Sequence, residues 1–186
     1  MRNAVKVGER VYLRPLERND ARELAMASHL ERETAHSASG RVPTSAIAFE
    51  AWPRKLDGRQ TPEDIVFSIC RRDDDRFLGT VRLGHLDWVN RTAETGTGLL
   101  DSADRGQGIG TEAKHLLLEY AFVDLGLHAL NSMVYEHNTR SIAALRKQGY
   151  RLAGRLTADV QRDGVFRDTL VFDITRDDWE LARGKR

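Results

Sequence analysis

Apolar and polar residues recur along this chain with two different periods, which predict its strands and its helices. A period of two predicts strands at 11–14, 64–71, 76–86, 92–100, 128–136, 150–158 and 165–174. A helical period predicts helices from Asp20 to Leu30, from Thr44 to Trp52, at 108–125 and at 139–148. This order indicates an α+β fold with a single mixed sheet of about seven strands and about four flanking helices.

One domain is expected to cover residues 1–186, since no repeat or linker interrupts them. Lysine plus arginine (29) nearly balances aspartate plus glutamate (28), so there is no basic field to attract nucleic acid or anionic lipid. Residues 1–10 lack the apolar core of a signal peptide, and no apolar run approaches the roughly 18 residues of a membrane span. We therefore expect a cytoplasmic protein that binds neither nucleic acid nor membrane.

Cysteine and histidine usage narrows the kinds of site further. Cys70 is the only cysteine, so an intrachain disulfide is excluded, and its place in an apolar run predicts a buried strand thiol. None of the six histidines has a partner at the spacing of a helical zinc pair. No metal site is expected.

A glycine-rich turn leads straight into the predicted helix at 108–125. It reads Arg105, Gly106, Gln107, Gly108, Ile109, Gly110 and Thr111. Glycines let backbone N–H groups approach an anion without obstruction by a Cβ atom, and the start of a helix adds unpaired N–H groups and the positive end of its dipole. The turn therefore predicts a site for the pyrophosphate of a phosphorylated cofactor.

Two better-known phosphate loops fit this turn poorly. A mononucleotide loop needs a Lys-Ser/Thr pair after its last glycine, where this chain has Thr111 and Glu112. The dinucleotide pattern Gly-x-Gly-x-x-Gly is met only in its alanine variant, with Ala113 in the third position. The NTPase interpretation fails, and the dinucleotide interpretation is weak.

The turn instead resembles the coenzyme A loop of the GCN5-related N-acetyltransferase (GNAT) superfamily, Arg/Gln-x-x-Gly-x-Gly/Ala, at Arg105, Gly108 and Gly110. A second match lies downstream: residues 138–142 are similar to the family's Asn-x-x-Ser-Ile, and residues 147–150 to its Lys-x-Gly-Phe/Tyr. Two motifs in the right order identify the chain as a member of this superfamily, which uses acetyl-CoA as co-substrate.

The resemblance extends almost from end to end. Residues 13–16 with Asp20 look like the opening of the ribosomal-protein N-terminal acetyltransferase (RimJ/RimL-like) branch. Its ending is matched by residues 154–155, Gly164 and residues 167–168. Bacterial spermidine acetyltransferases share much of this pattern. The branch therefore indicates the chemistry better than the acceptor.

The resemblance implies which groups bind coenzyme A. Backbone groups at Leu99 and Leu100 would hold the pantetheine and the thioester carbonyl, while N–H groups of 106–111 would take the pyrophosphate. Asn138 resembles the pantetheine-contacting asparagine of the family, with a plain turn role as its alternative.

Glu94 is the candidate catalytic base. It lies eleven positions before Arg105, the spacing of the catalytic glutamate in several histone-type members of the superfamily. In a regular strand it shares a face with Gly96 and Gly98, which suggests room for a substrate beside the carboxylate. The alternative is a strand glutamate that pairs with an arginine, such as Arg91 or Arg82.

The general acid is less well defined. Ser141 matches the family's serine at the start of the second helix, where it would either cap the helix or reach toward the sulfur of coenzyme A. Many members carry a tyrosine seven residues after the asparagine, but this position is Leu145 here. Tyr135 and Tyr150 are substitutes, each with a core role as its alternative.

Acceptor-pocket candidates come from residues that stand out against their segments. His36, His85, Trp52 and Trp88 would line a pocket, although each has an alternative as an ordinary surface or packing residue. Asp168 interrupts the apolar face that Phe166 and Leu170 predict for the last strand. It is therefore a candidate polar residue near the site.

The leading hypothesis is acetyl transfer from acetyl-CoA to a primary amine, most simply a protein N-terminal α-amine. A small-amine acceptor such as a polyamine is the second hypothesis, for which Glu31, Glu33 and Asp87 are a candidate acidic entrance. The vacant tyrosine position keeps open a third, a non-catalytic acyl-CoA sensor or partner subunit. Exposed edge strands would allow a homodimer, which nothing in the residues requires.

Overall fold

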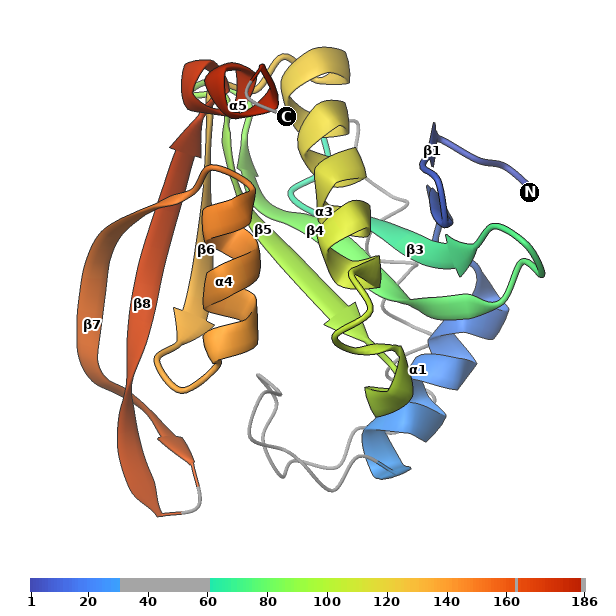
Figure 1. Cartoon of the computed structure of the whole chain (residues 1–186), viewed down its shortest axis with the longest axis horizontal. Helices are drawn as coiled ribbons and strands as arrows, with labels where there is room; N and C mark the ends of the chain where they lie inside the picture. The colour runs from blue at the N-terminus through green and yellow to red at the C-terminus, as the bar shows by residue number, and fades with distance from the viewer. Residues whose placement is uncertain (31–60, 163, 185–186) are drawn as a thin grey trace.

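A computed structural model describes residues 1–30, 61–162 and 164–184. They form one eight-stranded sheet in the order β1-β2-β3-β4-β5-β6-β8-β7 (Figure 1). Every neighbouring pair is antiparallel except β5 and β6, which are parallel. The predicted α+β fold with a single mixed sheet is confirmed, with eight strands in place of about seven.

The strands follow the predicted segments closely. Their bounds are β1 (Lys6–Val7), β2 (Val11–Pro15), β3 (Ile65–Arg71), β4 (Phe77–Asp87), β5 (Thr92–Leu99), β6 (Ala129–Tyr135), β7 (Arg151–Arg162) and β8 (Val165–Thr175). The prediction missed β1, because two residues are too short to show a period. It also ended β7 at residue 158, whereas the hairpin with β8 continues to Arg162.

The described residues contain four α-helices and two shorter helical turns. Their bounds are α1 (Arg18–Leu30), η2 (Ser102–Asp104), α3 (Ile109–Glu119), η3 (Tyr120–Asp124), α4 (Thr139–Lys147) and α5 (Arg176–Arg183). The helix predicted at 108–125 is α3 followed by η3, a π-helical turn. No helix of the described ranges is long and apolar enough to cross a membrane.

One helix starts earlier than predicted, and one helix was not predicted. The first helix begins at Arg18, so Asp20 lies in its first turn and is not its N-cap; the Asp20 carboxylate accepts a hydrogen bond from the Glu17 N–H (2.8 Å). Helix α5 was not predicted, because Trp179 is its only buried residue. A capping box between Thr175 and Asp178 starts it. The helix predicted from Thr44 lies outside the described residues.

The sheet is covered on both faces. Leu13 and Ile69 point into the main core, which they share with Leu117 of α3. Tyr12 and Cys70, one position along each strand, point to the other face, where Leu24 of α1 packs. The predicted burial of Cys70 is confirmed, and burial raises the pKa of its thiol.

Candidate active site

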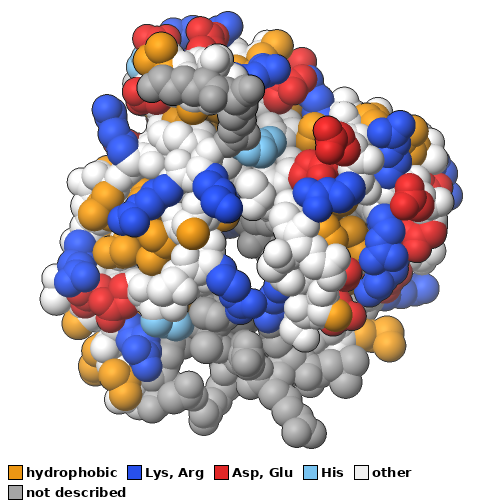
Figure 2. Space-filling view, viewed as in Figure 1, with side chains coloured by type: hydrophobic (Ala, Val, Ile, Leu, Met, Phe, Trp, Pro, Cys, Tyr) orange, Lys and Arg blue, Asp and Glu red, His pale blue; other side chains and the backbone are white. Residues whose placement is uncertain are grey.

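The site lies where β5 and β6 stop pairing. Their parallel pairing covers three positions, from Thr92–Glu94 against Ala129–Asn131, and then ends. Helices α3 and α4 lie side by side over this part of the sheet (Figure 1). The space-filling view shows a hollow between α4 and the loop before α3, with Lys and Arg side chains around it (Figure 2).

Where the backbone hydrogen bonds between β5 and β6 end, hydrogen bonds from side chains link the two strands. The Thr95 hydroxyl donates to the Asn131 carbonyl (3.1 Å), and the Ser132 hydroxyl donates to the Thr95 carbonyl (3.1 Å). The Tyr150 hydroxyl is 2.8 Å from Thr95 Oγ1. All of these side chains are buried. We call this group of side chains, together with Lys114, the apex network.

Lys114 of α3 joins the apex network from above the sheet. Its Nζ donates to Ser132 Oγ (3.1 Å) and lies 5.5 Å from the centre of the Tyr150 ring. The residue is 7% exposed, and no carboxylate of the described residues forms an ion pair with it. Burial lowers the pKa of Lys114 to about 7, although the charge of Glu94 acts in the opposite direction. Burial likewise raises the pKa of Tyr150.

The glycine turn has the backbone that the sequence predicts. Gly106 and Gly108 have φ of 79° and 82°, the left-handed region that favours glycine. A Cβ added to Gly106 would meet no heavy atom within 4 Å, so the space above it is open. Gly108 is the N-cap of α3, and no side chain caps this helix. An open cradle before an uncapped helix fits the pyrophosphate of acetyl-CoA.

Arg10, from the turn before β2, supports this loop from one side. Its guanidinium donates to the Gln107 carbonyl (2.6 Å) and to the Glu112 carboxylate (2.9 Å). Glu112 also accepts the backbone N–H of Arg10 (2.8 Å). Although burial acts to raise it, these hydrogen bonds keep the pKa of Glu112 below its usual value.

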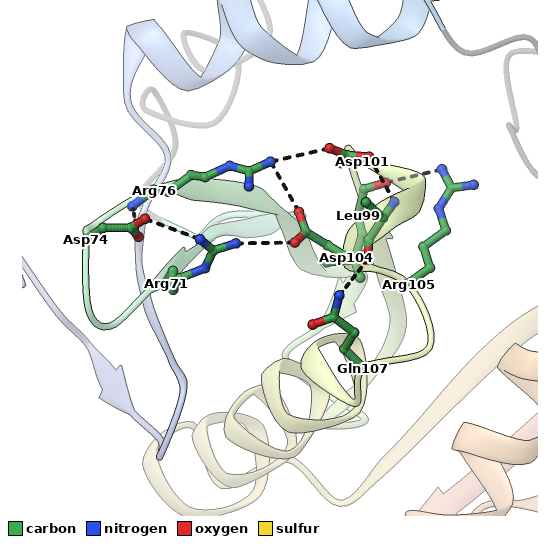
Figure 3. A network of polar contacts seen from close by, with 9 residues as sticks. Arg71, Asp74, Arg76, Leu99, Asp101, Asp104, Arg105 and Gln107 are labelled. Atoms are coloured by element: carbon green, nitrogen blue, oxygen red, sulfur yellow. Dashed lines mark hydrogen bonds and ion pairs between the residues drawn. The ribbon is translucent and has the colours of Figure 1, made fainter.

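Asp104 supports the loop from the other side (Figure 3). It is 5% exposed and pairs with Arg71 (3.3 Å) and Arg76 (3.4 Å) at the two ends of the β3–β4 turn. The Arg76 guanidinium also reaches Asp101 (3.5 Å), whose carboxylate caps η2 through the Ala103 N–H. The sequence did not identify Asp104, because its partners lie about 30 positions away.

Arg105 and the leucines at the end of β5 are joined directly. The Arg105 guanidinium donates to the Leu99 carbonyl (3.4 Å), and the Leu100 N–H donates to the Leu78 carbonyl (2.9 Å). These two backbone groups are therefore already hydrogen-bonded. The pantetheine contacts of Leu99 and Leu100 stay predictions.

Glu94 lies on the sheet face opposite α3. Its strand keeps a regular register through Gly98, so the predicted shared face with Gly96 and Gly98 is confirmed. The Arg82 guanidinium pairs with Glu94 (2.9 Å), which is one of the two alternatives that the sequence left open. A Cβ on Gly96 would come within 2.9 Å of Arg82, whereas one on Gly98 would meet nothing within 4 Å. The room that the glycines leave beside Glu94 is therefore filled by Arg82 and is open only at Gly98.

The start of α4 assigns the capping role to Asn138 and not to Ser141. Asn138 is the N-cap, and its Oδ1 accepts the backbone N–H of Ser141 (3.1 Å). Ser141 lies in the first helical turn. Leu145 is 2% exposed and belongs to the core, which is why a leucine fits there. The roles of Asn138 and Ser141 toward coenzyme A stay predictions.

The acceptor-pocket candidates separate into groups. His85 and Trp88 line a surface cavity of about 720 Å³ at the end of β4, together with Asp87 and Glu63. Asp168 is not part of this cavity, since its carboxylate pairs with Arg155 (3.0 Å) and accepts the Ala158 N–H (2.9 Å) inside the β7–β8 hairpin. His36 and Trp52 lie outside the described residues. Among the residues that the structure describes, no three His, Cys, Asp or Glu side chains are grouped to hold a metal ion.

Known proteins resemble this chain in sequence and in fold. A family profile described as "Acetyltransferase (GNAT) domain" matches residues 10–151. The chain is 32% identical to "Probable N-acetyltransferase YjcK" of Bacillus subtilis over 178 residues, which are 93% of this chain and 98% of that protein. It is 27% identical to "Putative ribosomal N-acetyltransferase YdaF" of Bacillus subtilis over 185 residues, which are 94% of this chain and 96% of that protein.

A solved structure adds evidence on the fold. The spermidine N-acetyltransferase from Vibrio cholerae in complex with CoA and spermine has a TM-score of 0.82 to this chain at 20% identity, covering 91% of this chain and 98% of that one. Identity this low shows the fold alone. A profile match that runs from β2 past the glycine loop and α4 shows more: this chain belongs to the GNAT acetyltransferases, enzymes that take their acetyl group from acetyl-CoA.

Proposed function

We propose that the chain is an N-acetyltransferase of the RimJ/RimL-like branch, one domain long, that acetylates the α-amine of a protein N-terminus. The observation that carries this proposal is the ion pair between Glu94 and Arg82 at 2.9 Å. Arg82 brings a positive charge to the carboxylate that would receive the proton of the amine. A second positive charge on the acceptor is repelled there, which disfavours a polyamine.

The pKa of the acceptor amine favours the same choice. An α-amino group titrates near 8 and is partly neutral at neutral pH, whereas a lysine or polyamine amine titrates near 10.4. The gap costs roughly 3 kcal/mol in preparing the nucleophile. An α-amine therefore demands less of the group that removes its proton than a lysine or a polyamine does. The relative named as a ribosomal N-acetyltransferase supports this choice.

Different residues bind acetyl-CoA and take part in the proton transfer. Backbone N–H groups of 106–111 at the start of α3 bind the pyrophosphate, and Arg105 holds the loop against β5. The amine attacks the thioester carbonyl where β5 and β6 diverge, and Glu94 receives the proton that the nitrogen loses. Asn138 and the first turn of α4 border this space.

A small-amine acceptor is the second candidate, and one observation favours it. The cavity of about 720 Å³ at the end of β4 combines the carboxylates of Glu63, Asp64 and Asp87 with Trp88. Carboxylates and an indole ring suit an organic cation. The spermidine acetyltransferases of the same fold act on such amines.

A thiol-release assay with acetyl-CoA tests the proposal. The acceptors are a peptide with a free α-amine, the same peptide acetylated at its N-terminus but carrying a lysine, and spermidine. We expect the highest kcat/KM for the free α-amine. A preference for spermidine moves the function to the second candidate, and coenzyme A binding without release for any acceptor supports a sensor.

Glu94→Gln tests the base with the preferred acceptor. We expect a loss of about 10²-fold in kcat/KM, the scale of general base catalysis. Glu180→Gln, an exposed carboxylate on α5, is the matched control and should keep the full rate. A Glu94→Gln variant as active as the control removes Glu94 from the mechanism.

A further inference from the structure

Lys114 is a buried cation for which the part of the chain that the structure describes supplies no counter-ion. It is 7% exposed, and the one hydrogen bond that it makes to a described residue goes to the neutral hydroxyl of Ser132 at 3.1 Å. A buried ammonium group is normally paired with a carboxylate, since a charge without a counter-ion in a protein interior costs several kcal/mol. No described carboxylate pairs with this one. Buried titratable groups without a counter-ion are found most often at functional sites, which makes Lys114 a functional candidate.

The position of Lys114 suggests what that function is. Lys114 lies five residues after Ile109 on α3, about 7.5 Å along the helix from the glycine turn. Its side chain reaches down to the point where β5 and β6 separate, between Thr95 and Ser132. The ammonium group of Lys114 therefore lies at the point where β5 and β6 separate, on the same helix that begins at the glycine turn.

Acetyl transfer creates a negative charge on sulfur whichever amine is the acceptor. The departing thiolate needs a proton, and Leu145 stands where many relatives carry a tyrosine. Tyr150 is a poor donor, because its hydroxyl is 2.8 Å from Thr95 Oγ1 and burial raises its pKa. The described titratable groups that act on Lys114 are Glu94 from β5 and Tyr150 ahead of β7.

We propose that Lys114 is a catalytic residue that donates a proton to the thiolate of coenzyme A as acetyl transfer occurs. The C–N bond to the acceptor forms, the C–S bond breaks, and its electron pair leaves on sulfur. Sulfur takes a proton from the Lys114 ammonium group, which becomes a neutral amine. The proton that the attacking nitrogen loses goes to Glu94, and exchange with solvent restores both groups. A burial-lowered pKa of about 7 makes this donor effective near neutral pH.

Three variants test the proposal kinetically. Lys114→Met keeps the shape but removes charge and proton, whereas Lys114→Arg keeps the charge and cannot release a proton near neutral pH. Both should lower kcat about 10²-fold while KM for acetyl-CoA changes less than about threefold. Lys147→Met, the same change at an exposed lysine on α4, is the control. A Lys114→Arg variant with the full rate overturns proton donation.

A binding measurement tests the same proposal without turnover. The ultraviolet absorbance of the thiolate reports the thiol pKa of coenzyme A bound to the protein. We expect binding to wild type to lower this pKa by about one unit or more through the Lys114 charge, and Lys114→Met to abolish the shift. Equal thiol pKa values for free and bound coenzyme A overturn the proposal even if Lys114→Met does not fold. A normal thiol shift with no turnover for any amine would instead count against the proposed acceptors.

Discussion

Arg14 and Lys114 are two buried cations in two parts of one fold, and both are 7% exposed. Arg14, between β2 and α1, makes a two-pronged pair with Asp20 at 2.6 and 2.8 Å, and Asp20 also accepts the hydroxyl of Ser68 (2.7 Å). Lys114, between α3 and the sheet, finds only a hydroxyl as hydrogen-bond acceptor within residues 1–30, 61–162 and 164–184. Both sites bury a positive charge, but the structure shows a carboxylate counter-ion only for Arg14.

The two pKa shifts express this difference. The hydrogen bonds that Arg14 donates to Asp20 raise the pKa of Arg14, and, although burial acts to raise it, they hold the pKa of Asp20 down. At Lys114 burial dominates, and the pKa falls to about 7. A buried charge with a full set of partners holds α1 to the sheet, whereas a buried charge without a counter-ion is available for chemistry.

Removing the partner of Arg14 should have the largest effect on stability. Asp20→Ala leaves a buried guanidinium without its carboxylate, so we expect the free energy of unfolding to fall by about 3–5 kcal/mol. Urea denaturation at pH 7 measures it. Asp177→Ala, an exposed aspartate on α5, is the control and should change it by less than about 0.5 kcal/mol. If Asp20→Ala is as mild as the control, the Arg14 pair is not a structural anchor.

Removing the Lys114 charge should change the free energy of unfolding in the opposite direction. Lys114→Met should raise the free energy of unfolding by about 2–4 kcal/mol at pH 7 while it lowers activity, because an unpaired charge leaves the interior. Between about pH 7 and 10.5 the unfolded chain binds a proton at Lys114 that the folded protein does not, so wild-type stability rises with pH there. The variant lacks this rise. A Lys114→Met protein less stable than wild type contradicts the comparison.

A smaller effect is expected before the glycine turn, where charges are paired as they are at Arg14. Asp104→Asn weakens the links to Arg71 and Arg76 that hold the loop before the glycine turn. We expect Kd for coenzyme A to rise roughly tenfold, about 1.4 kcal/mol, with kcat nearly unchanged. Calorimetric titration measures this Kd. The control is Asp73→Asn, in the β3–β4 turn between Arg71 and Arg76. A lowered kcat with normal binding would show that Asp104 acts elsewhere.

The glycine turn could be predicted from the sequence, because its geometry lies within seven consecutive residues. Gly106 and Gly108 supply the left-handed backbone, and α3 starts directly after them. The same holds for the boundaries of most strands. The supporting contacts of Arg10 and Asp104 could not be predicted, since their partners come from distant segments.

One residue of the apex network could have been identified from the sequence. Lys114 falls on the buried side of α3, between Ala113 and Leu117, where the helical period calls for an apolar residue. A lysine on the apolar face of a predicted helix is a candidate functional residue. Its partners Thr95, Ser132 and Tyr150 come from three other segments, so only the fold brings the network together.

The most direct test of the comparison is the titration of the lysine side chains, followed by NMR on protein labelled with ¹³C at lysine. The chain has only five lysines, so the Lys114→Met spectrum assigns the signal. We predict that Lys114 titrates near pH 7, well below the 10.4 of a lysine in a model peptide, and that bound coenzyme A thiolate raises the Lys114 value. A Lys114 signal that titrates near the model-peptide value of 10.4 would mean that its charge is not held without a counter-ion, and would contradict the account.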